Sequence, residues 1–306
     1  MGVQFLDWQR KNLVEESTEC QDGRPLLLAR HFDLVVLTDA VDLLKSLPSE
    51  SIDLVITDPA YESLEKHRAK GTTTRLKESN GSSNAWFDIF HDDRYPEFMT
   101  ELYRVMKPGS HAYIFCDETT LDVLKPIARE AGFWVWKSLI WVKTVKTPGQ
   151  LWEMIKDSLQ NNMSPKMLRD AILKVDVSEI LGRLTRTGMG YHWRASCERI
   201  LFLEKRSVKQ TWPRQSPTGK GIKLNDLAAK DVLYGSPVLG QDAYPTEKPV
   251  SVIKQLILNS SQQGDIVLDP FGGSGATGDA ARQLYRRFIL SDCSNNSISV
   301  MKKRFS

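Results

Sequence analysis

The 306-residue sequence has no long apolar run and no signal-like beginning. None of its apolar stretches approaches the roughly 18 residues of a membrane-spanning helix. The opening residues, MGVQFLDWQRKN, lack the apolar core of a secretory signal peptide. These absences exclude the membrane-embedded class and lead us to expect a cytoplasmic protein.

Cysteine and histidine are few and scattered. The four cysteines, Cys20, Cys116, Cys197 and Cys293, stand far apart, and no C-x-x-C pair or histidine at ligand spacing accompanies them. A disulfide framework or a zinc site needs closely spaced ligands of these types. The sequence therefore predicts no disulfide scaffold and no structural metal.

Positive charge is concentrated in the centre of the chain. Residues 137–223 hold 17 Lys and Arg against 7 Asp and Glu, a local charge of +10, although the net charge of the chain is only +3. Lys and Arg release counterions from phosphates, so a segregated basic region is typical of a protein that binds a polyanion. A merely solvated basic face is the alternative that composition leaves open.

Apolar runs alternate with helical stretches along most of the chain. Several runs are continuous, as in strands that are buried on both faces of a sheet. This alternation predicts an α/β fold with a mostly parallel sheet and helices on both faces. The expected strands are 32–39, 51–58, 110–117, 133–143, 198–205, 264–270 and 286–292, and the expected helices are 41–47, 94–106, 119–131, 249–261, 275–285 and 295–304.

Three segments interrupt this rhythm. Residues 62–86 are polar and typical of a surface loop, residues 144–190 have a helical core, and residues 206–245 look like loops around one short helix. The sequence has no internal repeats. We therefore expect a single domain over residues 1–306 with these three segments as insertions.

A glycine-rich turn near the end carries the most specific pattern. In GDIVLDPFGGSGATGDAARQLYRRFILSD, a strand runs to Asp269, and Gly273, Gly275 and Gly278 satisfy G-x-G-x-x-G before a helix. This fingerprint provides a tight turn, close ligand approach and helix packing. Asp292 lies 17 residues past Gly275, near the position where an acid binds ribose hydroxyls. The pattern predicts a nucleoside-containing ligand.

A nicotinamide-dependent oxidoreductase is the obvious rival interpretation. Such a fold needs several strands after the glycine turn, yet only 14 residues follow Asp292. The missing strands must come from earlier in the chain, which makes the sheet circularly permuted. Asp39, Asp58, Asp269 and Asp292 then follow four strands at their carboxyl ends, where open α/β sheets bind ligands. The stretch ITDPAY, residues 56–61, would face the same crevice as the glycine turn.

The glycine turn and the stretch ITDPAY resemble motifs of the S-adenosylmethionine-dependent amino-methyltransferases of DNA, in the permuted β class. The resemblance extends from about residue 30 to the end of the sequence. The family motif F-x-G-x-G is matched by Phe271, Gly273 and Gly275, and the catalytic motif D-P-P-Y by Asp58, Pro59 and Tyr61. The segments LTDAVDLLKSLP, AYPTEKPVSVIKQLI and GMGYHWRASCERILFLEKR resemble three further motifs in the β-class order. The resemblance implies a Rossmann-like methyltransferase fold whose catalytic motif precedes its cofactor motif.

The resemblance also implies roles for individual residues. The Asp58 carboxylate and the Pro59 carbonyl would accept the two N–H groups of a base amine, and Tyr61 would stack on the flipped base. Ala60 departs from the family motif, which has a second proline there. The residues implied for S-adenosylmethionine are Asp39, Ala40, Asp58, Thr246, Lys248, Pro249, Asp269, Phe271, Gly273, Ser274, Gly275, Thr277 and Asp292.

The resemblance favours adenine N6 as the target, because Asp opens the catalytic motif. Cytosine N4 and a non-catalytic DNA-binding protein with a relict site stay as alternatives. No nuclease-like P-D-x-D/E-x-K pattern is apparent, which favours a stand-alone methyltransferase, and β-class enzymes are often homodimers. Double-stranded DNA is the expected partner, and the candidate DNA contacts are Lys66, Arg68, Arg75, Arg183, Arg186, His192, Arg194, Trp212, Arg214 and Lys220.

Overall fold

One twisted sheet organises the part of the chain that the computed structural model describes, which is residues 33–62, 88–144, 196–206, 230–238, 244 and 246–306. Its strands lie in the order β1-β8-β7-β2-β3-β5-β4-β6. Their bounds are β1 Asp33–Leu37, β2 Ile52–Thr57, β3 Met106–Cys116, β4 Trp134–Lys143, β5 Cys197–Glu204, β6 Val232–Gly235, β7 Ile266–Asp269 and β8 Arg287–Asp292. The predicted α/β class is confirmed.

The sheet is mostly parallel. Strand β5 is the exception, since it runs antiparallel to both β3 and β4. The late strands β7 and β8 lie between β1 and β2, which come first in the described chain. The predicted circular permutation is therefore present in the strand order, and the glycine turn after β7 lies beside the end of β2.

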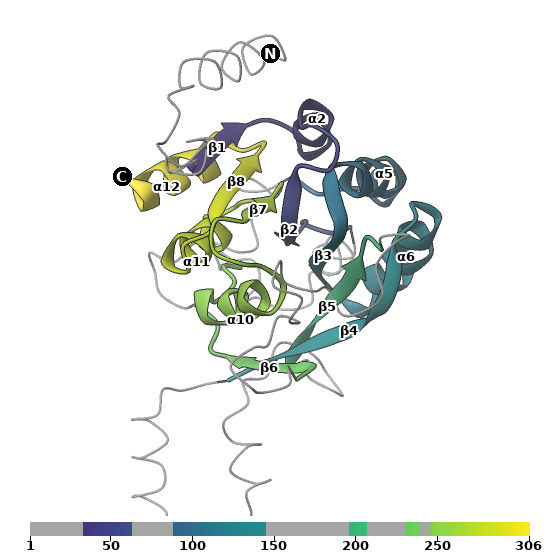
Figure 1. Ribbon diagram of the computed structural model, residues 1–306. Helices are drawn as coiled ribbons and strands as arrows, with labels where there is room; N and C mark the ends of the chain where they lie inside the picture. The colour runs from purple at the N-terminus through teal and green to yellow at the C-terminus, as the bar shows by residue number, and fades with distance from the viewer. Residues whose placement is uncertain (1–32, 63–87, 145–195, 207–229, 239–243, 245) are drawn as a thin grey trace, which may run out of the picture.

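Helices cover both faces of the sheet (Figure 1). Helices α2 (Ala40–Ser46), α5 (Tyr95–Val105) and α6 (Glu118–Glu130) pack on one face, and α10 (Val250–Ser260), α11 (Ala276–Gln283) and α12 (Asn295–Phe305) pack on the other. A short 3-10 turn, η3 (Asp92–Arg94), precedes α5. Each face has its own apolar core, as a doubly covered sheet requires.

Local sequence sets where several helices begin. The Asp39 side chain accepts a hydrogen bond from Val41 N at the start of α2, and Asp117 accepts one from Thr120 N at the start of α6. Ser294 caps α12 in the same way. Side-chain oxygens at these positions satisfy backbone N–H groups that the first helical turn leaves unpaired.

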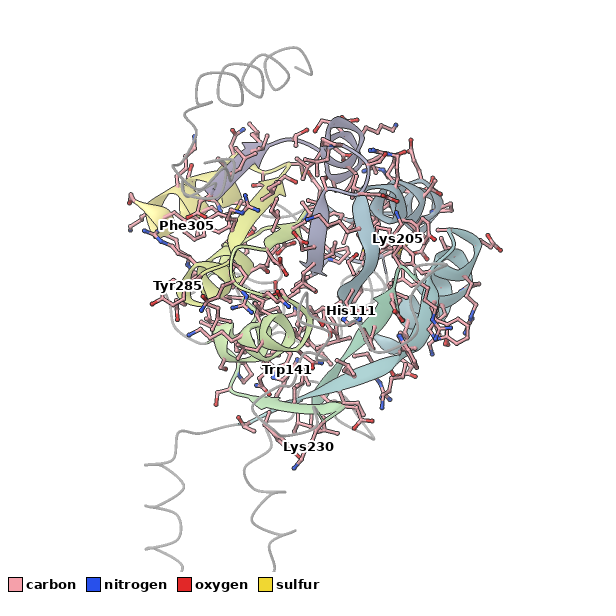
Figure 2. All side chains as sticks on the ribbon, in the orientation of Figure 1. His111, Trp141, Lys205, Lys230, Tyr285 and Phe305 are labelled. Carbon is pink, nitrogen blue, oxygen red and sulfur yellow. The ribbon has the colours of Figure 1, made fainter. Side chains whose placement is uncertain are left out.

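One strand was missed from the sequence. Residues 206–245 were expected to form loops around one short helix, but Val232–Gly235 form β6, which pairs in parallel with the end of β4. Four residues are too few to show periodicity. The strand depends on tertiary packing. Leu233 is buried in the apolar core that contains α10. The buried Trp141, labelled in Figure 2, donates its Nε1–H to the Gly235 carbonyl at 2.9 Å.

The rest of the predicted insertions 62–86, 144–190 and 206–245 lies outside the described residues, apart from their edges. Within the described ranges, no helix is long and apolar enough to cross a membrane.

Packing of β8 against α12 gives a direct test of the fold. Phe288 is fully buried, and its ring centroid lies 4.6 Å from that of Phe305. We expect Phe288→Ala to lower the free energy of unfolding by about 3 to 5 kcal/mol, because it removes buried contacts and leaves a cavity. Tyr285, which is 75% exposed at the rim of the molecule in Figure 2, is the control. Tyr285→Ala should change stability by less than about 0.5 kcal/mol in denaturant titrations, and equal losses in both variants would contradict this packing.

Candidate active site

Four carboxylates meet at one edge of the sheet. Asp39 follows β1, Asp58 follows β2, Asp269 ends β7 and Asp292 ends β8. Because β1, β8, β7 and β2 are adjacent and parallel, their carboxyl ends share this edge. The four side chains line one cavity of about 500 Å³. The expectation that ITDPAY faces the same crevice as the glycine turn is thus met in the structure.

The cavity gathers most of the residues that the sequence singled out. Besides the four aspartates, the lining includes Ala40, Pro59, Tyr61, Thr246, Lys248, Phe271, Gly273, Ser274 and Thr277. Two predicted residues lie outside it. Pro249 is the buried N-cap residue of α10. Gly275 is the N-cap residue of α11, has φ +81° and lies against Met301 and Phe305. Their positions point to roles in shaping the loops rather than in touching a ligand.

Asp292 orders the glycine turn. Its Oδ2 accepts a hydrogen bond from Gly273 N at 3.0 Å, and its Oδ1 accepts one from Ser294 N at 2.8 Å. Gly273 has φ +49°, a left-handed conformation that favours glycine. Burial raises the pKa of Asp292, and these backbone donors offset part of the rise. One carboxylate therefore joins the turn after β7 to the start of α12.

Asp269 is the most enclosed of the four acids. It accepts hydrogen bonds from Thr57 Oγ1 at 2.8 Å, Thr277 Oγ1 at 2.7 Å and Phe271 N at 3.1 Å. Burial raises the pKa of Asp269 to about 6, although the three donors act in the opposite direction. This carboxylate ties the end of β2 to the glycine turn and to α11.

Asp39 is held by a cation that the sequence did not single out. Its Oδ1 accepts hydrogen bonds from Val41 N at 2.9 Å and from Arg94 Nη2 at 2.8 Å. Burial alone would raise the pKa of Asp39, but Arg94 and the helix cap together hold it below its ordinary value. The Arg94 guanidinium also lies 4.7 Å from the centroid of the Phe90 ring and lines the cavity.

Asp58 lies in a row of alternating charges. Lys248 Nζ contacts Asp58 Oδ2 at 2.5 Å and Glu198 Oε2 at 3.4 Å, and Lys143 Nζ contacts Glu198 Oε1 at 2.6 Å. Burial raises the pKa of Asp58, and Lys248 opposes this rise. Burial alone would also raise the pKa of Glu198, but Lys248 and Lys143 outweigh burial and hold this pKa below its ordinary value. The pKa of Lys248 is raised, since its two carboxylates outweigh its burial.

The D-P-A-Y turn is anchored through its backbone. Phe90 N donates to the Ala60 carbonyl at 2.8 Å, and Tyr61 forms a bridge with Phe90. Within the described chain, none of the backbone hydrogen bonds outside helices and strands ends on the Pro59 carbonyl. The Ala60 position thus gains a restraint from Phe90, and Pro59 lies among the residues that line the cavity.

The cavity is also lined by residues that the sequence does not single out, namely Arg94, Lys143, Glu198, Asp88, Tyr244 and Cys293. Glu198 lies in GMGYHWRASCERILFLEKR, one of the segments that resemble a family motif, so a signal existed for it. The ten predicted DNA contacts, from Lys66 to Lys220, all lie outside the described residues. In the described ranges, no group of three or more His, Cys, Asp or Glu side chains is arranged to hold a metal ion.

Comparison with known proteins points in one direction. Residues 52–303 match the family model described as DNA methylase. The type II methyltransferase M.HinfI of Haemophilus influenzae is 26% identical over 271 residues, which are 87% of this chain and 66% of that protein. The DNA adenine methyltransferase YhdJ of Escherichia coli (strain K12) is 26% identical over 276 residues, covering 88% of this chain and 81% of that one.

Solved structures share the fold. A DNA modification methylase from Thermus thermophilus, complexed with S-adenosyl-L-methionine, superposes with a TM-score of 0.53 at 19% identity, covering 89% of this chain and 93% of that one. The cytosine-N4-specific PvuII DNA methyltransferase superposes with a TM-score of 0.55 at 17% identity, covering 89% and 86%.

The buried Asp269 carboxylate makes stability depend on pH. Its pKa is about 6 in the folded protein against 3.8 for a free side chain, so the folded state binds this proton more tightly. Its contribution to the free energy of unfolding is full below about pH 4 and is lost as pH rises to about 6. We expect the stability difference between wild type and Asp269→Asn to shrink by roughly 2 to 3 kcal/mol from pH 4 to pH 7.

Denaturant titrations across this pH range measure that difference. The exposed Asp122 of α6 supplies the control, and the difference between wild type and Asp122→Asn should stay flat with pH. A flat difference for Asp269→Asn would contradict its assigned titration.

Proposed function

The chain belongs to the DNA methylase family, and we propose that it transfers a methyl group from S-adenosylmethionine to the N6 amino group of adenine in double-stranded DNA. The observation that carries this proposal is the end of β2: the D-P-A-Y turn and the glycine turn line the same cavity. Asp as the first residue of the catalytic motif supports adenine over cytosine, and a relative named as a DNA adenine methyltransferase supports it too.

The residues of the cavity fit S-adenosylmethionine. Its volume of about 500 Å³ is in the range of small-molecule sites. The glycine turn gives close backbone approach at Gly273, and Asp39 and Asp292 supply acceptors for hydroxyl and amino groups. Four carboxylates around one cavity also suit a ligand that carries a sulfonium cation. We assign the nucleoside end to Asp39, Ala40, Phe271 and Asp292, and the methionine end to Thr246 and the glycine turn.

S-adenosylmethionine, when bound, supplies a methyl group that a nitrogen lone pair can accept. The amino group of a base is a poor nucleophile, because its lone pair is delocalised into the ring. The Asp58 carboxylate and the Pro59 carbonyl accept its two N–H groups and draw the nitrogen toward tetrahedral geometry. Acceptors aimed at developing positive charge are electrostatic preorganisation, usually a large catalytic term. Burial raises the pKa of Asp58, which suits this carboxylate to take the proton that the nitrogen then loses.

A base inside a duplex cannot reach these acceptors and must be extruded, at a cost of a few kcal/mol. Tyr61 lines the cavity two residues beyond Pro59, where its ring can stack on the extruded base and recover part of that cost. Burial raises the pKa of Tyr61, so the ring stays neutral at physiological pH.

We also propose a cytoplasmic homodimer that works without a metal. The candidate DNA contacts lie outside the described residues. Light scattering of the purified chain tests the dimer, and a single mass near 35 kDa, given the monomer mass of 34.7 kDa, would contradict it.

Transfer of tritiated methyl groups from S-adenosylmethionine to unmethylated DNA tests the proposed activity. We expect Asp58→Ala to lower transfer by at least about 100-fold, the scale for losing one preorganised polar group. Its affinity for S-adenosylmethionine, measured by calorimetry, should stay within a few-fold of wild type. Asp122→Ala, on the exposed face of α6, is the control and should transfer normally. No incorporation by wild type would overturn the activity, and equal loss of transfer and affinity in Asp58→Ala would overturn the role of Asp58.

A further inference from the structure

Four charged side chains from four parts of the fold form a row along the wall of the cavity. Asp58 follows β2, Lys248 precedes α10, Glu198 lies in β5 and Lys143 ends β4. The three contacts along the row measure 2.5, 3.4 and 2.6 Å, and the charges alternate in sign. The resemblance to known methyltransferases assigned no role to Glu198 or Lys143, and it implied Lys248 as a residue for S-adenosylmethionine.

The row is mostly buried, and its two lysines lie beside aromatic rings, where charges interact strongly. The Lys248 side chain is only 11% exposed, and its Nζ lies 5.4 Å from the centroid of the buried Phe115 ring. Lys143 Nζ lies 5.5 Å from the centroid of the buried Trp141 ring. Cations over aromatic rings are stabilised when water is excluded. Such charges are far less screened than surface ion pairs are.

Local structure holds each member of the row in place. Lys248 stands between Glu247, which is paired with Arg304 at 2.7 Å, and Pro249, the cap of α10. Thr246, two residues earlier, has φ +61°, a strained conformation for a β-branched residue. Glu198 pairs with Trp141 across β5 and β4, and Lys143 N donates to the Ser196 carbonyl at 2.9 Å. Backbone strain of this kind is typical of functional sites, which indicates that the fold holds Lys248 at a defined position in the cavity.

We propose that Glu198 is a positioning residue for the methyl transfer, which acts by holding Lys248 against Asp58 and so sets the charge of the carboxylate that receives the target amine. This inference rests on the proposed function and deepens it. Lys248 supplies the counter-charge that keeps Asp58 ionised in the cavity. Glu198 fixes Lys248 from the other side, and Lys143 neutralises Glu198, so that the row ends without an uncompensated buried charge.

The other charged or titratable groups near Asp58 do not duplicate this role. Among the described residues outside the row, they are Tyr61 on the same turn, Cys116 at the end of β3, Asp269 at the end of β7 and Tyr95 at the start of α5, whose pKa burial raises. Burial raises the pKa of the Cys116 thiol to about 12 and raises that of Tyr61, so both are neutral near pH 7. Asp269 brings negative charge and opposes ionisation of Asp58. Within the described chain, Lys248 is therefore the cation in direct contact with Asp58.

Substitutions of Lys248 and Glu198 should shift the pH profile of transfer in the same direction. Lys248→Met removes the cation from Asp58, so more of Asp58 is protonated at pH 6. The ratio of the transfer rate at pH 6 to that at pH 8 should fall about 10-fold or more below wild type. Glu198→Gln leaves Lys248 without the carboxylate that holds it against Asp58, so this variant should lower the same ratio, by less than Lys248→Met does. It should also lower the rate at pH 8 by about 10- to 100-fold, the scale for one charge-assisted hydrogen bond.

Lys107→Met is the matched control, because it also removes a lysine from an ion pair with a buried aspartate. Lys107 contacts Asp53 at 2.8 Å at the start of β2, the opposite end of the strand from Asp58. It should leave the pH 6 to pH 8 ratio unchanged. Single-turnover transfer of tritiated methyl groups to unmethylated DNA supplies the rates, and calorimetry supplies the affinity for S-adenosylmethionine.

Several outcomes would overturn the inference. They are a shift of Glu198→Gln in the direction opposite to that of Lys248→Met, no shift in either variant, or a Lys248→Met variant that loses only affinity for S-adenosylmethionine. If wild type transfers no methyl group, the proposed function fails, and thermal unfolding still tests the row. The loss of melting temperature in Lys248→Met should then be larger at pH 8 than at pH 5, because its two carboxylates lose their shared cation. A loss independent of pH would refute the row.

Discussion

The structure depends on the way in which four negative charges are accommodated at the ends of adjacent parallel strands. β1, β8, β7 and β2 deliver Asp39, Asp292, Asp269 and Asp58 to one cavity. Carboxylates in a partly buried site repel one another and lose hydration, so each needs compensation. The protein meets this need differently at each strand, and the differences separate the acids that are bound into the scaffold from Asp58, to which we assign the reaction.

Three of the acids are bound into the scaffold. Asp39 caps α2 and pairs with Arg94, Asp292 joins the glycine turn to α12, and Asp269 accepts two threonine hydroxyls and a backbone N–H. Asp58 alone is compensated by a lysine that is shared with a second carboxylate. A lysine is a compact charge that readjusts more easily than a hydrogen-bonded backbone. Asp58 is therefore the carboxylate best suited to exchange partners when a base amine arrives.

Much of the fold was accessible from the sequence because its strongest signals are local. Continuous apolar runs gave seven strands, and periodic segments between them gave six helices, each within a few residues of the observed bounds. The permuted order followed from the short tail after Asp292. Strand β6 was not accessible, since its four residues are defined by pairing with β4 rather than by their own pattern. Lys143 and Glu198 look like ordinary strand residues, and only the antiparallel pairing of β4 with β5 brings them together. Likewise, the motif resemblance located Lys248 near the site but not its contact with Asp58.

The identity of the methylated nucleoside tests the central claim most directly. DNA treated with the protein and isotope-labelled S-adenosylmethionine is digested to nucleosides and separated by chromatography with mass detection. The account predicts that the label appears in N6-methyldeoxyadenosine, because the Asp58 and Pro59 acceptors receive the adenine amino group. Label in N4-methyldeoxycytidine instead, or in no nucleoside at all, would contradict it.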